Sequence, residues 1–541
     1  FAELHREPGD RPDIETTLNP RGFITAFTVP AGAYAKRSRY LKVRDRESYA
    51  FAAASAAVAL DLDGERVREA RIALGGVATK PWRAREAEAA LADLLADDPL
   101  DAWGRHLAGQ PLPDDPTTLL DVALEHAAVG ETAPAVELLR QAAARPGPRG
   151  QRTVAPLAYY HLARVLDRAG EDPGAALDQA RRADATHCLA ATLDDVDVLT
   201  WATTVDPGDP RAHGLLGSWC YHHGQHDRAE QHWTVAATAP DPVTERNLGV
   251  LAWNARQDPD GAEAHYRRAR ELAPHDASLL SEHDQLAERR AVPVPDRLAA
   301  LAEHPGAVVA RDDLAVSWGR LLVLDGRAGE AVNWMRGRRF QPWEGGEGQV
   351  LAAWEAACLV ASAEASADEA VRLVAAALKT PESLGEARHP LSNPAHVWLA
   401  LGDARKRAGD AAGAEEAWRE AAHARGDFQE MAPTEHSEAT WFSVVAARRL
   451  GDEALASALV EGLDAYIREL RQTRPTIDYF ATSLPTMRLF RPDLQSAHDD
   501  RVTLLAAQLE QLRSGRTDEV ERLRVERPAE MVLTLMAAVR V

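Results

Sequence analysis

Cysteine, methionine and aromatic residues are scarce in this chain of 541 residues. The three cysteines, Cys188, Cys220 and Cys358, are far apart and form no Cys-x-x-Cys pair. This spacing argues against a disulfide framework and against a metal site built from thiolates. Aromatic residues make up 6% of the chain, whereas hydrophobic residues make up 45%. Most apolar side chains are therefore Ala, Leu and Val, which suit closely packed helices.

Long apolar runs are also absent, and one sign of charge dominates. No run is long enough to span a membrane, and no signal peptide opens the chain, which begins at Phe1 rather than at Met. We therefore expect a cytoplasmic protein with no membrane partner. The formal net charge of −21 would repel phosphates, so we expect no nucleic-acid partner. The first 90 residues hold 15 basic and 13 acidic residues, and the remainder carries −23.

The N-terminal part, residues 1–92, has a strand-like pattern. Four segments favour strands, and Asp63-Gly64 is typical of a tight turn between two of them. These segments are residues 23–29, 39–43, 50–63 and 67–74. A stretch rich in Pro and Asp follows, which predicts a linker over residues 93–116 and a second region over residues 117–541.

The second region repeats a spacing of small and large residues. A small residue is followed by a second small residue 12 positions later and by a large residue 16 positions later. The copies are Gly402, Ala414 and Trp418; Gly217, Ala229 and Trp233; Gly319, Ala331 and Met335; and Ala123, Ala135 and Leu139. A fifth copy, Gly249, Ala262 and Tyr266, has one residue inserted.

This spacing is that of tetratricopeptide helix pairs, in which small residues let two helices approach and a large one fills the groove. Asp325-Gly326, Gly409-Asp410 and Gly451-Asp452 stand where the turn inside a pair belongs. The sequence predicts a mostly α protein, a tetratricopeptide-like α-solenoid with a small N-terminal α+β domain. The surface of such an array suits a protein, peptide or glycan partner.

Three segments of the N-terminal part carry a family resemblance. They are residues 40–46 (Tyr-Leu-Lys-Val-Arg-Asp-Arg), 72–77 (Ile-Ala-Leu-Gly-Gly-Val) and 80–84 (Lys-Pro-Trp-Arg-Ala). Residues 1–92 resemble the C-terminal domain of FAD-binding subunits in the xanthine dehydrogenase and aldehyde oxidoreductase (CO dehydrogenase flavoprotein) family. The resemblance implies FAD as a cofactor, oxidoreductase subunits as partners, and Lys42 and Ile24 beside the flavin. The alternative is a solvated lysine and a core isoleucine. The family's phosphate-binding Gly-rich loops belong to a preceding domain, so no cofactor is expected for the isolated chain.

The helical part carries a second resemblance. Its residues are 340–348 (Phe-Gln-Pro-Trp-Glu-Gly-Gly-Glu-Gly), 384–386 (Leu-Gly-Glu) and 477–485 (Ile-Asp-Tyr-Phe-Ala-Thr-Ser-Leu-Pro). Residues 117–541 resemble the repeat region of a bacterial tetratricopeptide family whose N-terminal β-sandwich is similar to parts of carbohydrate-processing enzymes. An accessory role beside such an enzyme is therefore one alternative function.

Non-repeat residues of these segments are candidates for a ligand or partner surface. Paired carboxylates are what glycoside hydrolysis requires, but a structural loop between repeats explains the same residues. The segment at 477–485 favours a cap on the array, with a binding role as the alternative. The candidate residues are Trp343, Glu344, Glu347, Glu386, Arg388, His389, Tyr479 and Phe480.

Four histidines cluster at His222, His223, His226 and His232. Their spacing would allow a zinc or nickel site, but the repeat pattern places them around an exposed turn, so we expect no metal. No nucleophile elbow, phosphate-binding loop, metalloprotease motif or complete dinucleotide fingerprint occurs, and we assign no catalytic residue. The sequence favours a non-catalytic scaffold, with an accessory FAD-binding subunit fragment of a molybdenum-containing oxidoreductase as the alternative.

Overall fold

The computed structural model describes residues 4–539 apart from several gaps. The gaps are residues 7–8, 12, 20, 29–37, 44–50, 64–65, 79, 91–111, 113–114, 129, 146–152, 342, 344, 430–431 and 478–487. Two compact units divide the chain at residue 205, Phe1–Val205 and Asp206–Val541. The predicted linker lies largely in the gap at 91–111, so the boundaries at 92 and 117 stay predictions.

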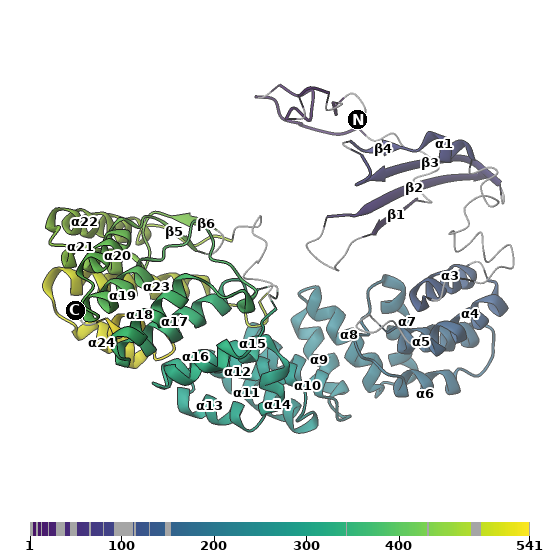
Figure 1. Cartoon of the computed structure of the whole chain (residues 1–541). Helices are drawn as coiled ribbons and strands as arrows, with labels where there is room; N and C mark the ends of the chain where they lie inside the picture. The colour runs from purple at the N-terminus through teal and green to yellow at the C-terminus, as the bar shows by residue number, and fades with distance from the viewer. Residues whose placement is uncertain are drawn as a thin grey trace. The chain divides into compact units, whose positions relative to one another are not determined.

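The first unit contains an antiparallel sheet of order β1-β2-β3-β4 (Figure 1). Its elements are β1 (Ser38–Val43), β2 (Ala54–Asp63), β3 (Arg66–Gly75), β4 (Trp82–Arg83) and the short helix α1 (Arg85–Ala90). Three of the predicted strands are confirmed. The predicted strand at 23–29 is wrong over its described residues, because residues 22–28 are irregular and pair with no strand there.

Five helices follow among the described residues of this unit, and the first two of them confirm one copy of the repeat pattern. They are α3 (Pro116–Ala128), α4 (Thr132–Ala144), α5 (Ala155–Arg168), α6 (Gly174–Arg182) and α7 (Leu193–Val205). Ala123, Ala135 and Leu139 are all fully buried where α3 meets α4. This copy, which has alanine where the others have glycine, therefore packs as a helix pair.

The second unit is a series of helices, each packed against the next along the chain. Its first elements are α8 (Pro210–His222), α9 (His226–Ala236), α10 (Pro242–Leu251), the π-helix η3 (Ala252–Arg256), α11 (Pro259–Leu272), α12 (Ala277–Arg289), α13 (Val294–Ala302), α14 (Pro305–Ala310), α15 (Asp312–Leu324) and α16 (Ala328–Arg336). They are followed by α17 (Gln349–Glu364), α18 (Ala367–Leu378), η4 (Glu382–Leu384), α19 (Ala395–Arg407), α20 (Ala411–His423), β5 (Asp427–Gln429), β6 (Ala432–Thr434), α21 (Thr440–Arg449), α22 (Glu453–Leu470), α23 (Leu494–Ser514), α24 (Asp518–Glu526) and α25 (Met531–Ala538).

The predicted interlock of small and large residues holds these pairs together. A Cβ atom built on Gly217 would lie 2.4 Å from Cδ1 of Trp233. The same atom on Gly402 would lie 2.3 Å from Cδ1 of Trp418. Only hydrogen leaves room for these rings, so a large residue from one helix occupies the space over a glycine of its partner. The tetratricopeptide-like pairing is confirmed.

The glycines of the predicted turns have left-handed backbone. Gly326, Gly409 and Gly451 have φ values of +78°, +84° and +74° between the paired helices. At two of these turns the following aspartate caps the next helix: Asp410 accepts a hydrogen bond from the Gly413 amide, and Asp452 accepts one from the Leu455 amide. The Gly-Asp pairs therefore end one helix and begin the next.

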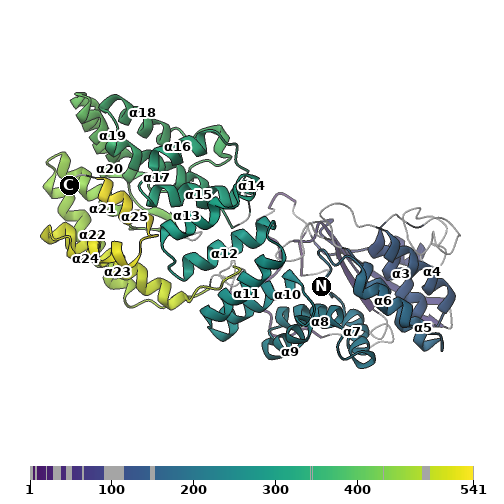
Figure 2. The same cartoon turned by 90° about the horizontal axis from the view of Figure 1, so that it is seen from below.

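The C-terminal helices return to the array. α25 packs on α17 (Figure 2). Met531 and Leu535 contact the core cluster that contains Trp354, and Leu533 and Met536 belong to the cluster around α21 to α23. The last helix thus joins two cores. No described helix combines the length and apolar character needed to cross a bilayer, and the three cysteines are buried thiols.

Candidate functional site

In the glycine-rich loop at 343–348, the ring of Trp343 packs over Gly346. A Cβ atom on Gly346 would lie 2.1 Å from Cε2 of Trp343, whose ring packs against the neighbouring core. Glu347 is exposed, and Glu344 lies outside the described residues. The described part of this loop thus uses Trp343 for packing and leaves one carboxylate toward solvent.

Glu386 lies at the start of α17. Its carboxylate accepts hydrogen bonds from the backbone amides of Gly348 at 3.1 Å and Leu351 at 3.0 Å. These amides have no partner within the helix, and the positive end of the helix dipole favours an anion there. Burial nevertheless raises the pKa of Glu386, with a further contribution from Glu347. The observed contacts of Glu386 are those of a helix cap.

Arg388 and His389 face packing partners in the same region. Arg388 forms an ion pair with the buried Glu355 at 2.6 Å, and His396 contacts the second oxygen of that carboxylate at 2.9 Å. The His389 ring stacks on Phe428 with centroids 4.0 Å apart. The structure therefore places Glu386 and Arg388 in structural contacts, and a ligand-binding role for these residues stays a prediction. A small cavity of about 120 Å³ lies elsewhere, between α21 and α23.

The histidine cluster does not converge on one point. His232 instead meets His213, with the two Nδ1 atoms 2.9 Å apart, and His223 stacks on Trp219. Burial, together with the neighbouring charges of His213 and Arg228, lowers the pKa of His232 to about 4. No group of three metal-ligating side chains occurs among the described residues.

A different contact joins distant parts of the second unit. Tyr479 and Phe480 lie outside the described residues, but the segment 488–491 that follows them crosses back to η3. The Asn254 amide donates to the Leu489 carbonyl at 2.8 Å, and its oxygen accepts from the Arg491 amide at 2.8 Å. One side chain thus makes the two backbone hydrogen bonds that a residue of a neighbouring parallel strand would make.

Phe490 anchors this segment. Its side chain is 1% exposed and belongs to the core cluster of α10 to α12. Its ring meets Trp253 edge-on at 5.8 Å and Tyr266 at 5.7 Å, and the Arg289 guanidinium lies 5.9 Å from its centre. Leu489 is half-buried against the same cluster. We call this place, formed by residues of α8, α10, η3, α11 and α12, the segment groove.

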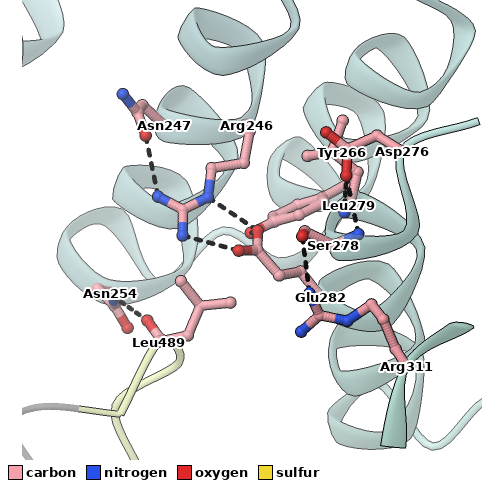
Figure 3. Close-up of polar contacts among 10 residues, drawn as sticks. All are labelled: Arg246, Asn247, Asn254, Tyr266, Asp276, Ser278, Leu279, Glu282, Arg311 and Leu489. Carbon is pink, nitrogen blue, oxygen red and sulfur yellow. Dashed lines mark hydrogen bonds and ion pairs between the residues drawn. The ribbon is translucent and has the colours of Figure 1, made fainter. Parts of the chain in front are cut away.

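Beside the segment groove, three side chains form a polar network whose hydrogen bonds involve no residue of the segment (Figure 3). Arg246 donates to both oxygens of Glu282, at 2.8 and 2.9 Å, and the Tyr266 hydroxyl donates to the same carboxylate at 2.9 Å. Burial alone would lower the pKa of Arg246, but Glu282 holds it above its ordinary value. Burial, together with Glu282, raises the pKa of Tyr266. The groove wall is therefore fixed by α10, α11 and α12.

The π-helix explains how Asn254 comes to face the groove. η3 occupies Ala252–Arg256, between Gly249 and Ala262 of the repeat copy that carries one inserted residue. A π-helical turn absorbs one extra residue while the flanking helix keeps its packing, and such turns are frequent at functional sites. The insertion visible in the sequence was the signal that could have located this site.

Both candidate cofactor residues of the first unit are exposed. Lys42 on β1 is exposed, and the Ile24 side chain is 43% exposed rather than in the core. Gly76 has a φ of +79°, and a Cβ atom there would lie 3.0 Å from the Ala52 carbonyl oxygen, so it serves a close turn. The described residues before residue 91 hold no Gly-rich loop at the start of a long helix, so they do not fit the FAD pyrophosphate.

Comparison with known proteins separates the two parts of the chain. The model of the CO dehydrogenase flavoprotein C-terminal domain matches residues 39–118. The aldehyde oxidoreductase FAD-binding subunit PaoB of Escherichia coli (strain K12) is 47% identical over 91 residues. The N-terminal segment is similar to a flavoprotein domain. The match covers 17% of this chain and 27% of that subunit, so the chain spans about a quarter of its length.

Two solved structures are similar to part of this chain at low identity. A tetratricopeptide repeat protein from Parabacteroides merdae has a TM-score of 0.24 and 11% identity, covering 57% of this chain and 91% of its own. Pseudomonas aeruginosa pilF has a TM-score of 0.24 and 14% identity, covering 48% and 92%. The repeat architecture of this chain rests on its own helix pairs.

Proposed function

We propose that residues 206–541 form a scaffold that binds a segment of a partner polypeptide in the segment groove. The observation that carries this proposal is the Asn254 amide, which holds the backbone of residues 489–491 by two hydrogen bonds while Phe490 fills the adjoining apolar space. Backbone hydrogen bonds are available to any sequence, whereas the apolar space selects a side chain. This combination is how repeat and strand-addition surfaces recognise peptides.

The test is a random peptide library displayed on phage and selected on the full chain. The chain carries Phe490→Ala so that its own segment competes less. We then add Asn254→Ala to this chain. We expect the selected peptides to bind the double variant at least about tenfold more weakly than they bind the Phe490→Ala parent, because two hydrogen bonds are lost. Asn247→Ala is the matched control, since Asn247 accepts from Arg246 and does not contact the segment. Peptides that bind all three variants equally would contradict the proposal.

A second candidate is an accessory role in a molybdenum-containing oxidoreductase, which the match at residues 39–118 favours. Tyr40, Leu41 and Val43 of β1 are each more than half exposed. Successive residues of a strand point to opposite faces, so both faces of β1 are open to an oxidoreductase subunit. FAD would then come from elsewhere in such an assembly.

Flavin titration tests that candidate. We expect the purified chain to be colourless and to show no saturable FAD binding up to millimolar concentration, because the described residues provide no pyrophosphate cradle. Flavin absorbance and tryptophan fluorescence are the readouts. Saturable micromolar binding that Lys42→Ala weakens would instead bring the oxidoreductase role forward. A glycan ligand at residues 343–389 and a cytoplasmic location stay predictions.

A further inference from the structure

We infer that residues 488–491 are an internal ligand of the segment groove, standing in for a partner segment that carries a Leu-Phe pair preceded by an acidic residue. This inference rests on the proposed function and names the partner that the site accepts. Two residues of the chain's own segment, Leu489 and Phe490, fit the groove well, whereas a third, Arg488, fits it poorly.

The two good positions are Leu489 and Phe490. Phe490 is fully enclosed by aromatic and aliphatic side chains, and Leu489 lies half-buried beside it. The Asn254 amide fixes the backbone on both sides of the phenylalanine, so the ring enters in one register. A partner must therefore supply an aromatic side chain directly after an aliphatic one, with free backbone groups on either side.

The poor position is Arg488. It is exposed and lies two residues before Phe490, over whose ring the Arg289 guanidinium stands at 5.9 Å. Burial lowers the pKa of Arg289, and Arg488 lowers it further, so two like charges oppose each other at this end of the groove. Glu288 beside Arg289 is already engaged, pairing with Arg297 at 3.2 Å and Arg320 at 3.5 Å. An acidic residue in place of Arg488 would convert this repulsion into attraction.

The polar wall of the groove does not depend on the segment for its hydrogen bonds. Arg246, Glu282 and Tyr266 satisfy one another, and the Asn254 amide also donates to the Tyr221 hydroxyl at 3.0 Å. The chain's own segment has the advantage of being tethered, which corresponds to an effective concentration of about the millimolar range. A better-matched partner segment in trans therefore competes with it on affinity.

The experiment measures fluorescence anisotropy of three labelled nine-residue peptides with the full chain. The first has the sequence of residues 486–494, the second carries Arg488→Glu, and the third carries Arg488→Glu with Phe490→Ala. The protein is wild type, Phe490→Ala, or Arg491→Pro, which removes the amide donor to Asn254 and leaves the groove intact. Circular dichroism establishes that each variant is folded. If Phe490→Ala does not fold, the peptide affinities of Arg491→Pro test the inference alone.

We expect the second peptide to bind the vacated variants at least about tenfold more tightly than it binds wild type, since the tethered segment no longer competes. It should also bind them several-fold more tightly than the first peptide, and Arg289→Ala should remove that difference. The third peptide should not bind. Equal binding to wild type and to the vacated variants, or indifference to Phe490, would overturn the inference.

The two proposals fail in different ways. If library peptides bind through Asn254 but the Leu-Phe peptides do not, the proposed function stands and this inference falls. If no peptide binds any folded variant, both fall.

Discussion

Arg297→Ala is expected to lower the free energy of unfolding of the transition that includes α12 and α13 by about 3–5 kcal/mol. Arg297 and Asp284 are both buried, with 4% of each side chain exposed, and two hydrogen bonds of 2.9 Å join them. Burial alone would lower the pKa of Arg297, but Asp284 raises it above the ordinary value. Removing the guanidinium leaves a carboxylate buried without its partner, which is the main cost.

The double variant Arg297→Met with Asp284→Leu distinguishes the cost of an unpaired buried charge from the loss of packing contacts. It removes both charges, so we expect it to recover most of the lost stability. Arg522→Ala is a surface control, because this arginine pairs with Glu519 and Glu526 in solvent; its effect should stay below about 1 kcal/mol. Urea unfolding followed by far-ultraviolet circular dichroism gives all three values. A loss below about 1 kcal/mol for Arg297→Ala would contradict the buried pair.

Gly402→Ala has the second large expected effect. The added Cβ would lie 2.3 Å from Cδ1 of Trp418, and the Trp418 indole is itself held by its hydrogen bond to Asp403 at 2.9 Å. Because neither the ring nor the helix can retreat freely, we expect a loss of about 1–3 kcal/mol. Urea unfolding measures it.

Gly329→Ala is the matched control for that substitution. Gly329 also lies in a helix, but nothing stands within 4 Å of its added Cβ. Replacing a helical glycine by alanine there should raise stability by about 0.5–1 kcal/mol. Opposite signs for the two substitutions would support the interlock, whereas a gain at both positions would show that Trp418 does not fill the space over Gly402.

The helix pairs could be predicted because their contacts are local. Gly402 and Trp418 are 16 residues apart, so one spacing rule reaches both sides of the contact. The strands of the first unit followed from alternation and turn residues, except at residues 22–28. That segment has strand-forming residues, yet no described strand pairs with it, and Phe23 is 81% exposed.

The segment groove could not be predicted in the same way. Asn254 and Leu489 are 235 residues apart, and no periodic pattern connects them. The inserted residue near Asn254 marked an irregular helix but did not name what it binds. Glu386 shows the converse difficulty: a loop carboxylate has the same sequence signature whether it faces a ligand or accepts backbone hydrogen bonds from a helix end.

Hydrogen exchange followed by mass spectrometry tests the binding groove most directly. The full chain is measured with and without a library-selected peptide. We predict slower exchange of the amides in α8 to α12 and faster exchange of the Arg491 amide, which loses its acceptor on Asn254 when the chain's own segment leaves. Slower exchange confined to other helices, with Arg491 unchanged, would contradict the account and place the binding surface elsewhere.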